Sequence, residues 1–420
     1  MFDTIDDAFE CSGYDQLEVY AETENTIEAT VSDGNLDSVQ SDTSKGVGVR
    51  ALVDNTVGFA YTTDPARVRD TAQRAIKLAR LSQFEQISFP VAGTYPSIPG
   101  LFDEETADLT QADIAEQLNT AVSAHDTAFP EGQVARTTGT SYIRNSAGME
   151  AKQDETYFVS YLSANAHGRS KYWFDAARSR FDVSAVANEA VDLVEAYDET
   201  EPMNDGVYDI VLTPFAQYQI FSGILYPAFN ADRVQRGKSH YEGMKGEKVA
   251  SEGLSIIDDR RKEEGVRSRP FDREGTPAQR TTLIDDGVLS NFLYDIQRAE
   301  KESVESTGNA SGGYKSFPTI EPSNITLEGS QDSLTSPDDT VVIHSVSGVH
   351  TANETSGDFS LNLDTAYRGA GKDRVGLEGG LFVGNVFELL ESFAFFTGDR
   401  RTIDSLTTRP AVFKDQKLVN

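Results

Sequence analysis

The class of fold is decided by the segments LEVYA (residues 17–21), TIEATV (26–31) and DGN (33–35), together with the segment 36–39 that follows them. The first two segments place an apolar residue at every second position, which is typical of half-buried β-strands. Asp-Gly-Asn is a strong signal for a tight hairpin turn. The sequence therefore predicts antiparallel strands on either side of this turn.

The rest of the N-terminal half alternates predicted strands and helices. Further strands are expected at 46–53, 57–61, 134–166 and 171–181, with turns at 54–55 and 145–148. Asp64-Pro65 has the residue types of a helix N-cap and first turn, and the apolar face of that helix comprises Val68, Ala72, Ala75, Ile76 and Ala79. Two more helices are expected at 111–124 and 183–196. We therefore expect residues 1–200 to form an α/β domain with a mixed sheet and helices.

An acidic stretch at 198–205, interrupted by Pro202, is the predicted domain boundary. Beyond it, a buried strand at 207–212 leads through Thr213-Pro214 into a helix. Strands are also expected at 281–284, 288–294, 324–327 and 341–345. Residues 206–420 should therefore form a second domain rich in antiparallel sheet, and the whole chain an α+β fold.

The charge of the chain excludes one large class of function. The 420 residues include 68 acids and 37 bases, which gives a net charge of −31. Such a field repels nucleic-acid phosphates and anionic membrane surfaces, so we expect no direct nucleic-acid or membrane partner. Acids spread along the whole chain, with few lysines, favour a cytoplasmic protein of a halophile; an ordinary acidic protein is the alternative.

Few residues are candidates for metal or acid–base chemistry. Cys11 is the only cysteine, so the chain can form neither an internal disulfide nor a multi-cysteine zinc site. The five histidines, which show no HExxH spacing, are His125, His167, His240, His344 and His350. His344 and His350 are interpreted as loop or surface residues, with metal ligands as the alternative, and His240 as a lone polar residue. The pairs Asp258-Asp259 and Asp285-Asp286 could be acid–base dyads or cation ligands, although adjacent acids arise by chance in so acidic a chain, and the second pair suits a hairpin turn.

Several longer strings resemble the TldD/PmbA family of metallopeptidases, also called modulators of DNA gyrase. In the N-terminal half they are DGN (33–35), GVGVR (46–50) and GFAYTTD (58–64). In the C-terminal half they are RGKS (236–239), Gly243, GEKVAS (246–251), Asp258-Asp259, FLYD (292–295), STGNA (306–310) and GDFS (357–360). The resemblance covers almost the whole chain and implies the family's two-domain fold.

The resemblance also indicates the branch of the family. TldD-type chains carry HExxxH on the helix after the strand placed here at 207–212, and a cysteine near the C-terminus. That motif aligns with residues 222–227, where Ser222 and Pro227 replace the histidines and Gly223 replaces the glutamate. Serine and proline offer no nitrogen ligand and glycine no general base. The chain thus resembles the PmbA (TldE) branch, for which we expect no catalytic residue, no metal and no cofactor in this chain.

The geometry of an ideal helix is consistent with that expectation. Residues 222 and 227 are five positions apart, or about 140° around an α-helix, so two ligands there need a distorted turn. Phe215, Tyr218, Leu225 and Phe229 are predicted to share a packed face with Ser222, and Pro227 to kink or end the helix.

In the family, two subunit types form a heterodimer that cleaves unfolded peptides. The resemblance therefore implies that this chain is the non-catalytic subunit, that zinc lies in a TldD-like partner and that unfolded peptides are the substrates. The alternative is a metal-free peptide-binding or regulatory homodimer without proteolytic activity.

Overall fold

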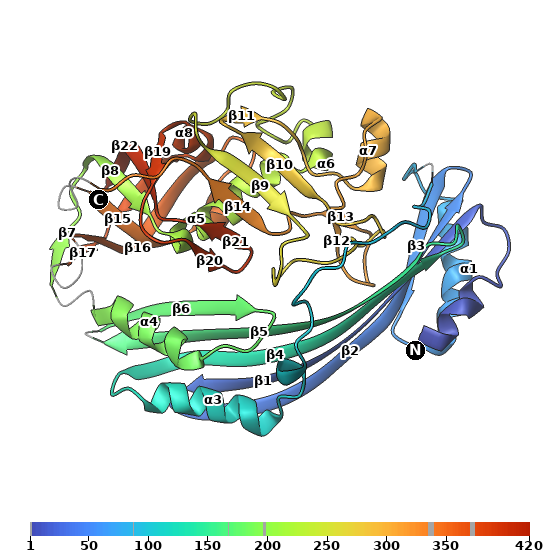
Figure 1. Cartoon of the computed structure of the whole chain (residues 1–420), viewed down its shortest axis with the longest axis horizontal. Coiled ribbons are helices and arrows are strands. Elements are labelled where there is room, and N and C mark those ends of the chain that lie inside the picture. Colours follow the sequence, from blue (N-terminus) through green and yellow to red (C-terminus); the bar gives the residue numbers. More distant parts are fainter. Residues whose placement is uncertain (1, 87, 167, 196–198, 335–339, 370–373) are drawn as a thin grey trace.

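The computed structural model describes residues 2–86, 88–166, 168–195, 199–334, 340–369 and 374–420. The chain has the expected α+β fold, with a long curved sheet in the N-terminal half and sheets of mostly shorter strands in the C-terminal half that lie over one face of it (Figure 1). No helix in these ranges is both long and apolar enough to cross a membrane.

The N-terminal sheet has the strand order β3-β2-β1-β4-β5-β6. Its strands are β1 (Gln16–Ser32), β2 (Asn35–Val53), β3 (Thr56–Thr62), β4 (Ala128–Asn145), β5 (Glu150–Ala166) and β6 (Arg169–Ala177). The predicted turns are confirmed, because Asp33, Asp54 and Asn55 adopt positive φ angles and 145–148 joins β4 to β5. The predicted hairpin at 33–35 is therefore correct.

Two expectations about this sheet are wrong in detail. All of its strand pairs are antiparallel, so the sheet is not mixed; tight hairpins join β1 to β2, β2 to β3 and β4 to β5, and such short connections permit only antiparallel neighbours. The separate strands expected at 17–21 and 26–31 form the single strand β1, and those at 36–39 and 46–53 form β2, because backbone pairing continues through the polar residues between them.

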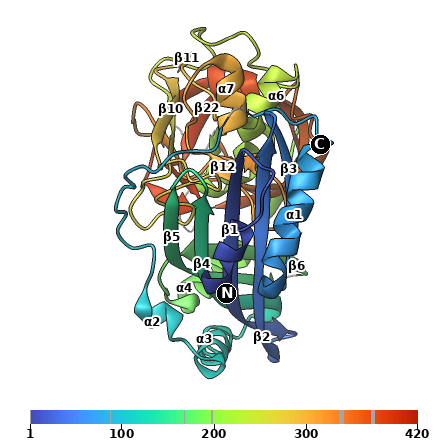
Figure 2. The same cartoon turned by 90° about the vertical axis from the view of Figure 1, so that its right-hand side faces the viewer.

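Four helices pack on the N-terminal sheet. They are α1 (Val68–Ala79), the short α2 (Glu104–Ala107), which was not predicted, α3 (Gln111–Ser123) and α4 (Val183–Glu195). Asp64 caps a 3-10 turn, Pro65–Arg67, that leads into α1, and all five residues of the predicted apolar face are buried. Helices α3 and α4 cover the face of the sheet that points away from the C-terminal half, whereas α1 packs near β2 and β3 (Figure 2).

The C-terminal half contains two larger sheets that are mainly antiparallel, as expected. One has the order β15-β8-β22-β18-β16-β17-β7, with β19 paired to β22; the other has the order β11-β10-β9-β14-β21-β20. Parallel pairs occur between β8 and β15, β14 and β21, and β7 and β17. The two-residue strand β11 is shorter than the predicted strand 288–294.

The bounds of the C-terminal elements are as follows. The strands are β7 (Thr200–Pro202), β8 (Gly206–Leu212), β9 (Ser255–Asp259), β10 (Arg280–Asp285), β11 (Val288–Leu289), β12 (Ala310–Ser311), β13 (Thr319–Ile320), β14 (Ile325–Glu328), β15 (Val341–Ser347), β16 (Asp358–Arg368), β17 (Val375–Glu378), β18 (Leu381–Asn385), β19 (Phe393–Phe396), β20 (Arg401–Ile403), β21 (Leu406–Thr408) and β22 (Ala411–Val419). The helices are α5 (Pro214–Ile220), α6 (Ala231–Gln235), α7 (Ile296–Glu302) and α8 (Val386–Glu391).

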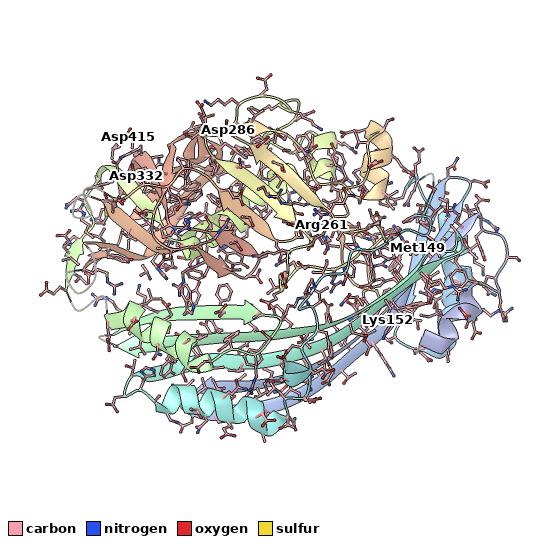
Figure 3. The ribbon with its side chains drawn as sticks, in the orientation of Figure 1. Met149, Lys152, Arg261, Asp286, Asp332 and Asp415 are labelled. Atoms are coloured by element: carbon pink, nitrogen blue, oxygen red, sulfur yellow. The ribbon has the colours of Figure 1, made fainter. Side chains whose placement is uncertain are left out.

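The loop between β9 and β10, residues 260–279, packs against the N-terminal sheet. Phe271 from this loop is buried with Tyr20 of β1 and with Met149, which precedes β5 and is labelled in Figure 3. Gly275 has a φ of 81°, and a Cβ atom there would lie 2.5 Å from Cε of Met149. The loop therefore fits the sheet closely only because this position is glycine.

Candidate functional site

The residues that replace the metallopeptidase motif lie on the helical segment after β8, as predicted. Thr213 caps α5 by accepting a hydrogen bond from the backbone N–H of Ala216, and Pro214 occupies the first turn. Gln217 is fully buried and fully bonded: its amide donates to the carbonyls of Leu212 and Arg409 and accepts from the Thr408 hydroxyl. The start of the segment is therefore held firmly in the core.

The segment then leaves α-helical geometry. A π turn spans Phe221–Leu225, in which the Tyr226 N–H bonds to the carbonyl of Phe221, and a 3-10 turn spans Tyr226–Phe229. Pro227 has no N–H with which to continue an α-helical ladder. The wide turn that two ligands at 222 and 227 would need is thus present in this chain.

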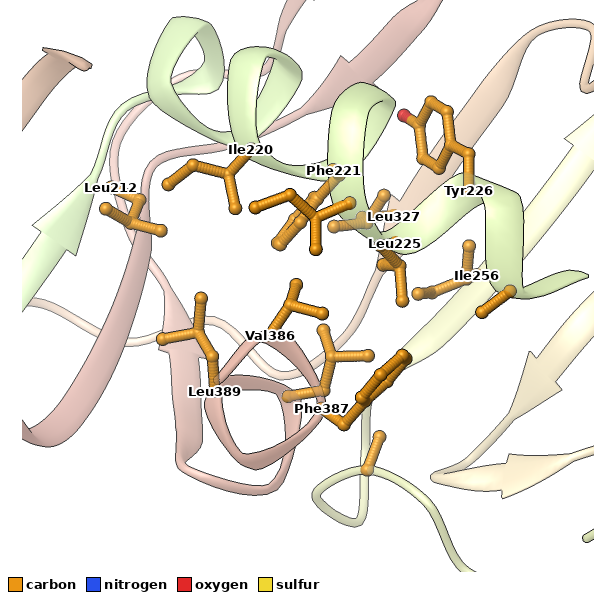
Figure 4. Packing of buried hydrophobic residues seen from close by; sticks show 14 of the residues in the cluster. Leu212, Ile220, Phe221, Leu225, Tyr226, Ile256, Leu327, Val386, Phe387 and Leu389 are labelled. Carbon is orange, nitrogen blue, oxygen red and sulfur yellow. The ribbon is translucent and has the colours of Figure 1, made fainter. Parts of the chain in front are cut away.

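The predicted packed face is confirmed only in part. Leu225 and Phe229 are buried in the core of the C-terminal half, where Figure 4 shows Leu225, whereas Phe215 is buried in a separate cluster with Trp173 of β6. Ser222, expected on the same face, is exposed and donates a long hydrogen bond of 3.5 Å to the carbonyl of Gln219. The π turn changes the angular spacing of the side chains, so Ser222 leaves the packed face.

Ser222 and Pro227 line a cavity of about 280 Å³ with Tyr218 and Tyr226. The Tyr218 hydroxyl donates to Asp404 over 3.1 Å, and burial together with the charge of Asp404 raises the pKa of Tyr218 to about 12. The Tyr226 hydroxyl is buried without a hydrogen-bond partner and points away from the apolar cluster in Figure 4. The motif positions therefore border a partly polar cavity.

The donor set of this cavity does not fit a catalytic zinc. Such a site uses three nitrogen, sulfur or carboxylate ligands from the protein, whereas Ser222, Gly223 and Pro227 supply none of them. In the part of the chain that the structure describes, no three His, Cys, Asp or Glu side chains are grouped as metal ligands. Cys11 lies in the N-terminal half, where its thiol contacts the carbonyl of Arg69.

The structure disperses the histidines. His240 stacks on Phe387 with a ring separation of 3.9 Å, and His350 lies on the surface. His344 is buried next to Trp173, contrary to its interpretation as a loop or surface residue, because it lies on strand β15; burial lowers its pKa to about 3. His125 lies next to Phe129, and His167 falls outside the described residues.

The contacts of the two aspartate pairs indicate structural roles. Asp258 is fully buried and accepts hydrogen bonds from the side chains of Asn309 and Ser323. Asp285 ends β10, and Asp286 has a positive φ angle in the turn to β11, as the hairpin interpretation predicted. Asp258 thus ties β9 to two later loops.

An arginine-rich segment, which the sequence motifs did not predict as part of the site, lies next to the cavity. Residues 260–273 contain five of the chain's 24 arginines. Two further cavities, of about 350 and 280 Å³, lie along this segment, and both share Arg267 with the cavity at Ser222. The density of arginine in so acidic a chain was the signal that could have identified the segment.

Hydrogen bonds to two buried charged side chains, Arg178 and Asp272, hold this segment in place. Arg178 donates to the carbonyls of Gly265 and Ser268, and its guanidinium also pairs with Glu155 over 2.8 Å. Asp272 accepts hydrogen bonds from the backbone N–H groups of residues 274, 276 and 310, while burial and the charge of Glu274 raise its pKa. The arginines therefore lie on a loop that is anchored by buried hydrogen bonds.

Three family profiles match the chain. They describe PmbA/TldA metallopeptidase domain 1 at residues 17–79, the central domain at 99–196 and the C-terminal domain at 205–418.

The chain is also similar to individual proteins. An uncharacterized protein of Methanocaldococcus jannaschii is 32% identical over 91% of each chain, and a Methanothermobacter thermautotrophicus protein named metalloprotease is 28% identical over 74% of this chain and 71% of its own. The crystal structure of TldE from Thermococcus kodakarensis superposes with a TM-score of 0.90 at 22% identity, covering all of both chains. This chain belongs to the PmbA/TldD family of metallopeptidase proteins.

Proposed function

We propose that this chain is the non-catalytic, PmbA/TldE-like subunit of a heterodimeric peptidase whose zinc lies in a TldD-like partner. The observation that carries the proposal is the set Ser222, Gly223 and Pro227 on the turn where catalytic chains of the family have their motif. None of these side chains can act as a zinc ligand of the usual kind or as a general base. The fold shared with TldE is consistent with this role.

The proposed role is to complete a chamber in which the partner cleaves unfolded peptides. The cavity at Ser222, within the C-terminal half, is lined by Tyr218, Tyr226 and Arg267, and a neighbouring cavity between the two halves also contains Arg267. The aromatic side chains offer contact area to apolar residues of a peptide, and Arg267 offers hydrogen-bond donors to peptide carbonyl groups. We place this complex in the cytoplasm.

Purification with and without the partner tests the role. Alone, the chain should contain well under one zinc per subunit and hydrolyse no unfolded peptide, because it lacks a ligand set. Together with a TldD-like chain from the same cell extract, it should co-purify as a complex that hydrolyses casein-like unfolded substrates and loses this activity with a chelator. Zinc analysis, pull-down and a peptidase assay give the three readouts.

Two results would contradict the assignment. Stoichiometric zinc with chelator-sensitive hydrolysis by the isolated chain would make it a catalytic subunit. A homodimer that binds unfolded peptide, and that recovers no TldD-like chain from the extract, would favour the alternative of a regulatory protein without proteolytic activity.

We also propose that the protein works at high salt. At a net charge of −31, repulsion between carboxylates destabilises the folded state in dilute buffer, and salt screens it. The melting temperature should therefore rise between dilute buffer and molar KCl. A flat or falling melting temperature over that range would reject this proposal.

A further inference from the structure

The third cavity, of about 280 Å³, is lined by a concentration of positive charge that internal partners do not fully use. Four arginines reach it, namely Arg260, Arg267, Arg269 and Arg273. Arg269 is paired with Glu155, and Arg267 bonds to Asp404 over 3.4 Å. Arg260 and Arg273 are the two whose guanidinium groups keep unused donors.

Arg260 is 6% exposed, and no hydrogen bond or ion pair joins its side chain to any residue that the structure describes. The charges of Asp258 and Asp272 act on Arg260 without an ion pair between the side chains. Their oxygens already accept hydrogen bonds from other donors, including Ser323 and the backbone N–H of Ala310. The charge of Arg260 is therefore left without a direct partner.

Arg273 is 3% exposed and is fixed on one side only. Its Nη1 donates to Glu18 over 3.2 Å, and its guanidinium lies 3.8 Å from the centre of the Tyr20 ring. Its Nε and Nη2 have no acceptor. These two nitrogens carry three N–H groups without an acceptor, but protein encloses both of them, so Arg273 contributes mainly its positive charge to the cavity.

Leaving buried guanidinium donors without acceptors is costly, and burial accordingly lowers the pKa of both Arg260 and Arg273. A bound anion in the cavity would supply acceptors to the outer nitrogens of the Arg260 guanidinium, which lines the cavity and has no partner among the described residues. The cavity is also lined by Glu22 and Glu321, whose charges disfavour a ligand with two or more negative charges. The complement of this site is a planar group with one negative charge and two acceptor oxygens, which a guanidinium binds in a bidentate manner.

We propose that the cavity lined by Arg260 and Arg273 binds a carboxylate group. It shares Arg267, Glu321 and Pro322 with the cavity at Ser222, so a chain lying in one cavity can place its end in the other. On the proposed function, the carboxylate is the C-terminus of an unfolded peptide; the carboxylate site itself does not depend on that function. A free small organic acid presents the same chemistry.

Binding to the isolated chain at fixed KCl concentration tests the site. The probes are acetate, with chloride as the matched salt, and an uncharged acetylated hexapeptide with either a free C-terminal carboxylate or a C-terminal amide. The free-acid peptide should bind at least about tenfold more tightly than the amide by calorimetry, because charge-assisted hydrogen bonds are lost with the carboxylate. The same ligand should raise the melting temperature.

Arg260→Gln should remove that preference, so that both peptides bind equally weakly. The matched control is Arg261→Gln, which removes the same charge from an exposed neighbour whose closest acid, Asp259, is 4.0 Å away, and which should leave the preference intact. Figure 3 labels Arg261 near the junction of the two halves. The melting temperature of each variant without ligand serves as its own baseline, because the charge of Arg260 also acts on the buried carboxylates of Asp258 and Asp272.

The outcomes separate the source of the carboxylate from the existence of the site. Preference for the free-acid peptide that depends on Arg260 supports a peptide terminus. Stabilisation by acetate that depends on Arg260, without peptide binding, supports the site with a small acid as ligand. Equal behaviour of the parent and Arg260→Gln towards all probes overturns the proposal, whether or not a TldD-like partner is recovered by pull-down.

Discussion

Replacing Arg50 with methionine is expected to lower the free energy of unfolding by about 3–5 kcal/mol. Arg50 is 2% exposed and lies between two buried carboxylates. Its Nε and Nη2 donate to Glu18 over 2.9 and 2.6 Å, and its Nη1 donates to Glu274 over 2.6 Å. Removing the guanidinium leaves both buried carboxylates without this ion pair. The resulting loss of stability exceeds the gain from the apolar contacts of methionine.

This network also joins the two halves of the chain. Glu18 and Arg50 lie on β1 and β2, whereas Glu274 and Arg273 belong to the loop between β9 and β10. The second oxygen of Glu274 accepts the backbone N–H of Ile296 at the start of α7. We therefore expect Arg50→Met to loosen the contact between the halves, so that their unfolding becomes less cooperative as well as easier.

Urea unfolding at a constant high KCl concentration measures both effects. Arg69→Met is the matched control, because Arg69 pairs with Glu10 over 3.0 Å at an exposed site and such pairs contribute at most about 1 kcal/mol. A loss of the same small size in both variants would show that the buried network does not hold the halves together.

The strand predictions show which strand residues can be predicted from alternating apolar and polar side chains and which cannot. The segments 17–21 and 26–31 were found from their alternating apolar residues; burial alternates only at 26–31, whereas all five residues of 17–21 are buried, including Glu18. Residues 40–43 of β2 are exposed and polar, so no burial pattern marks them as strand, yet they pair with 25–28 of β1 along the backbone. The length of these strands depends on pairing partners, which local sequence does not encode.

The candidate site was predictable only at its motif. Resemblance located Ser222, Gly223 and Pro227, and the helix before them followed from Thr213-Pro214. The exposure of Ser222 depends on a π turn, and the surrounding cavity uses Arg267 and Ser405, which are distant in sequence. Tertiary packing brings these groups together, so no spacing rule could have predicted the cavity.

Restoring the HExxxH residues at positions 222, 223 and 227 is not expected to restore zinc binding or peptidase activity. In the triple variant Ser222→His, Gly223→Glu and Pro227→His, the main obstacle is position 223, where a Cβ atom would lie 2.3 Å from Cγ1 of Val349. A glutamate there forces Val349 or the backbone to move, and overpacking of this kind costs about 1–3 kcal/mol. The change at 227 also restores an N–H that the π turn and the following 3-10 turn are built without.

Zinc binding would not offset that loss of stability. The variant has at most two histidine ligands, whereas a catalytic zinc normally has three protein ligands, and the only cysteine, Cys11, lies in the N-terminal half. Ser222→His alone is the matched control; because Ser222 is exposed, it should change the stability by no more than about 0.5 kcal/mol. The triple variant should melt below both the parent and this control and show no peptidase activity. One tightly bound zinc per chain with measurable turnover would instead mean that the turn retains a competent scaffold, and that the loss of catalysis in this chain lies in three side chains and not in the packing around them.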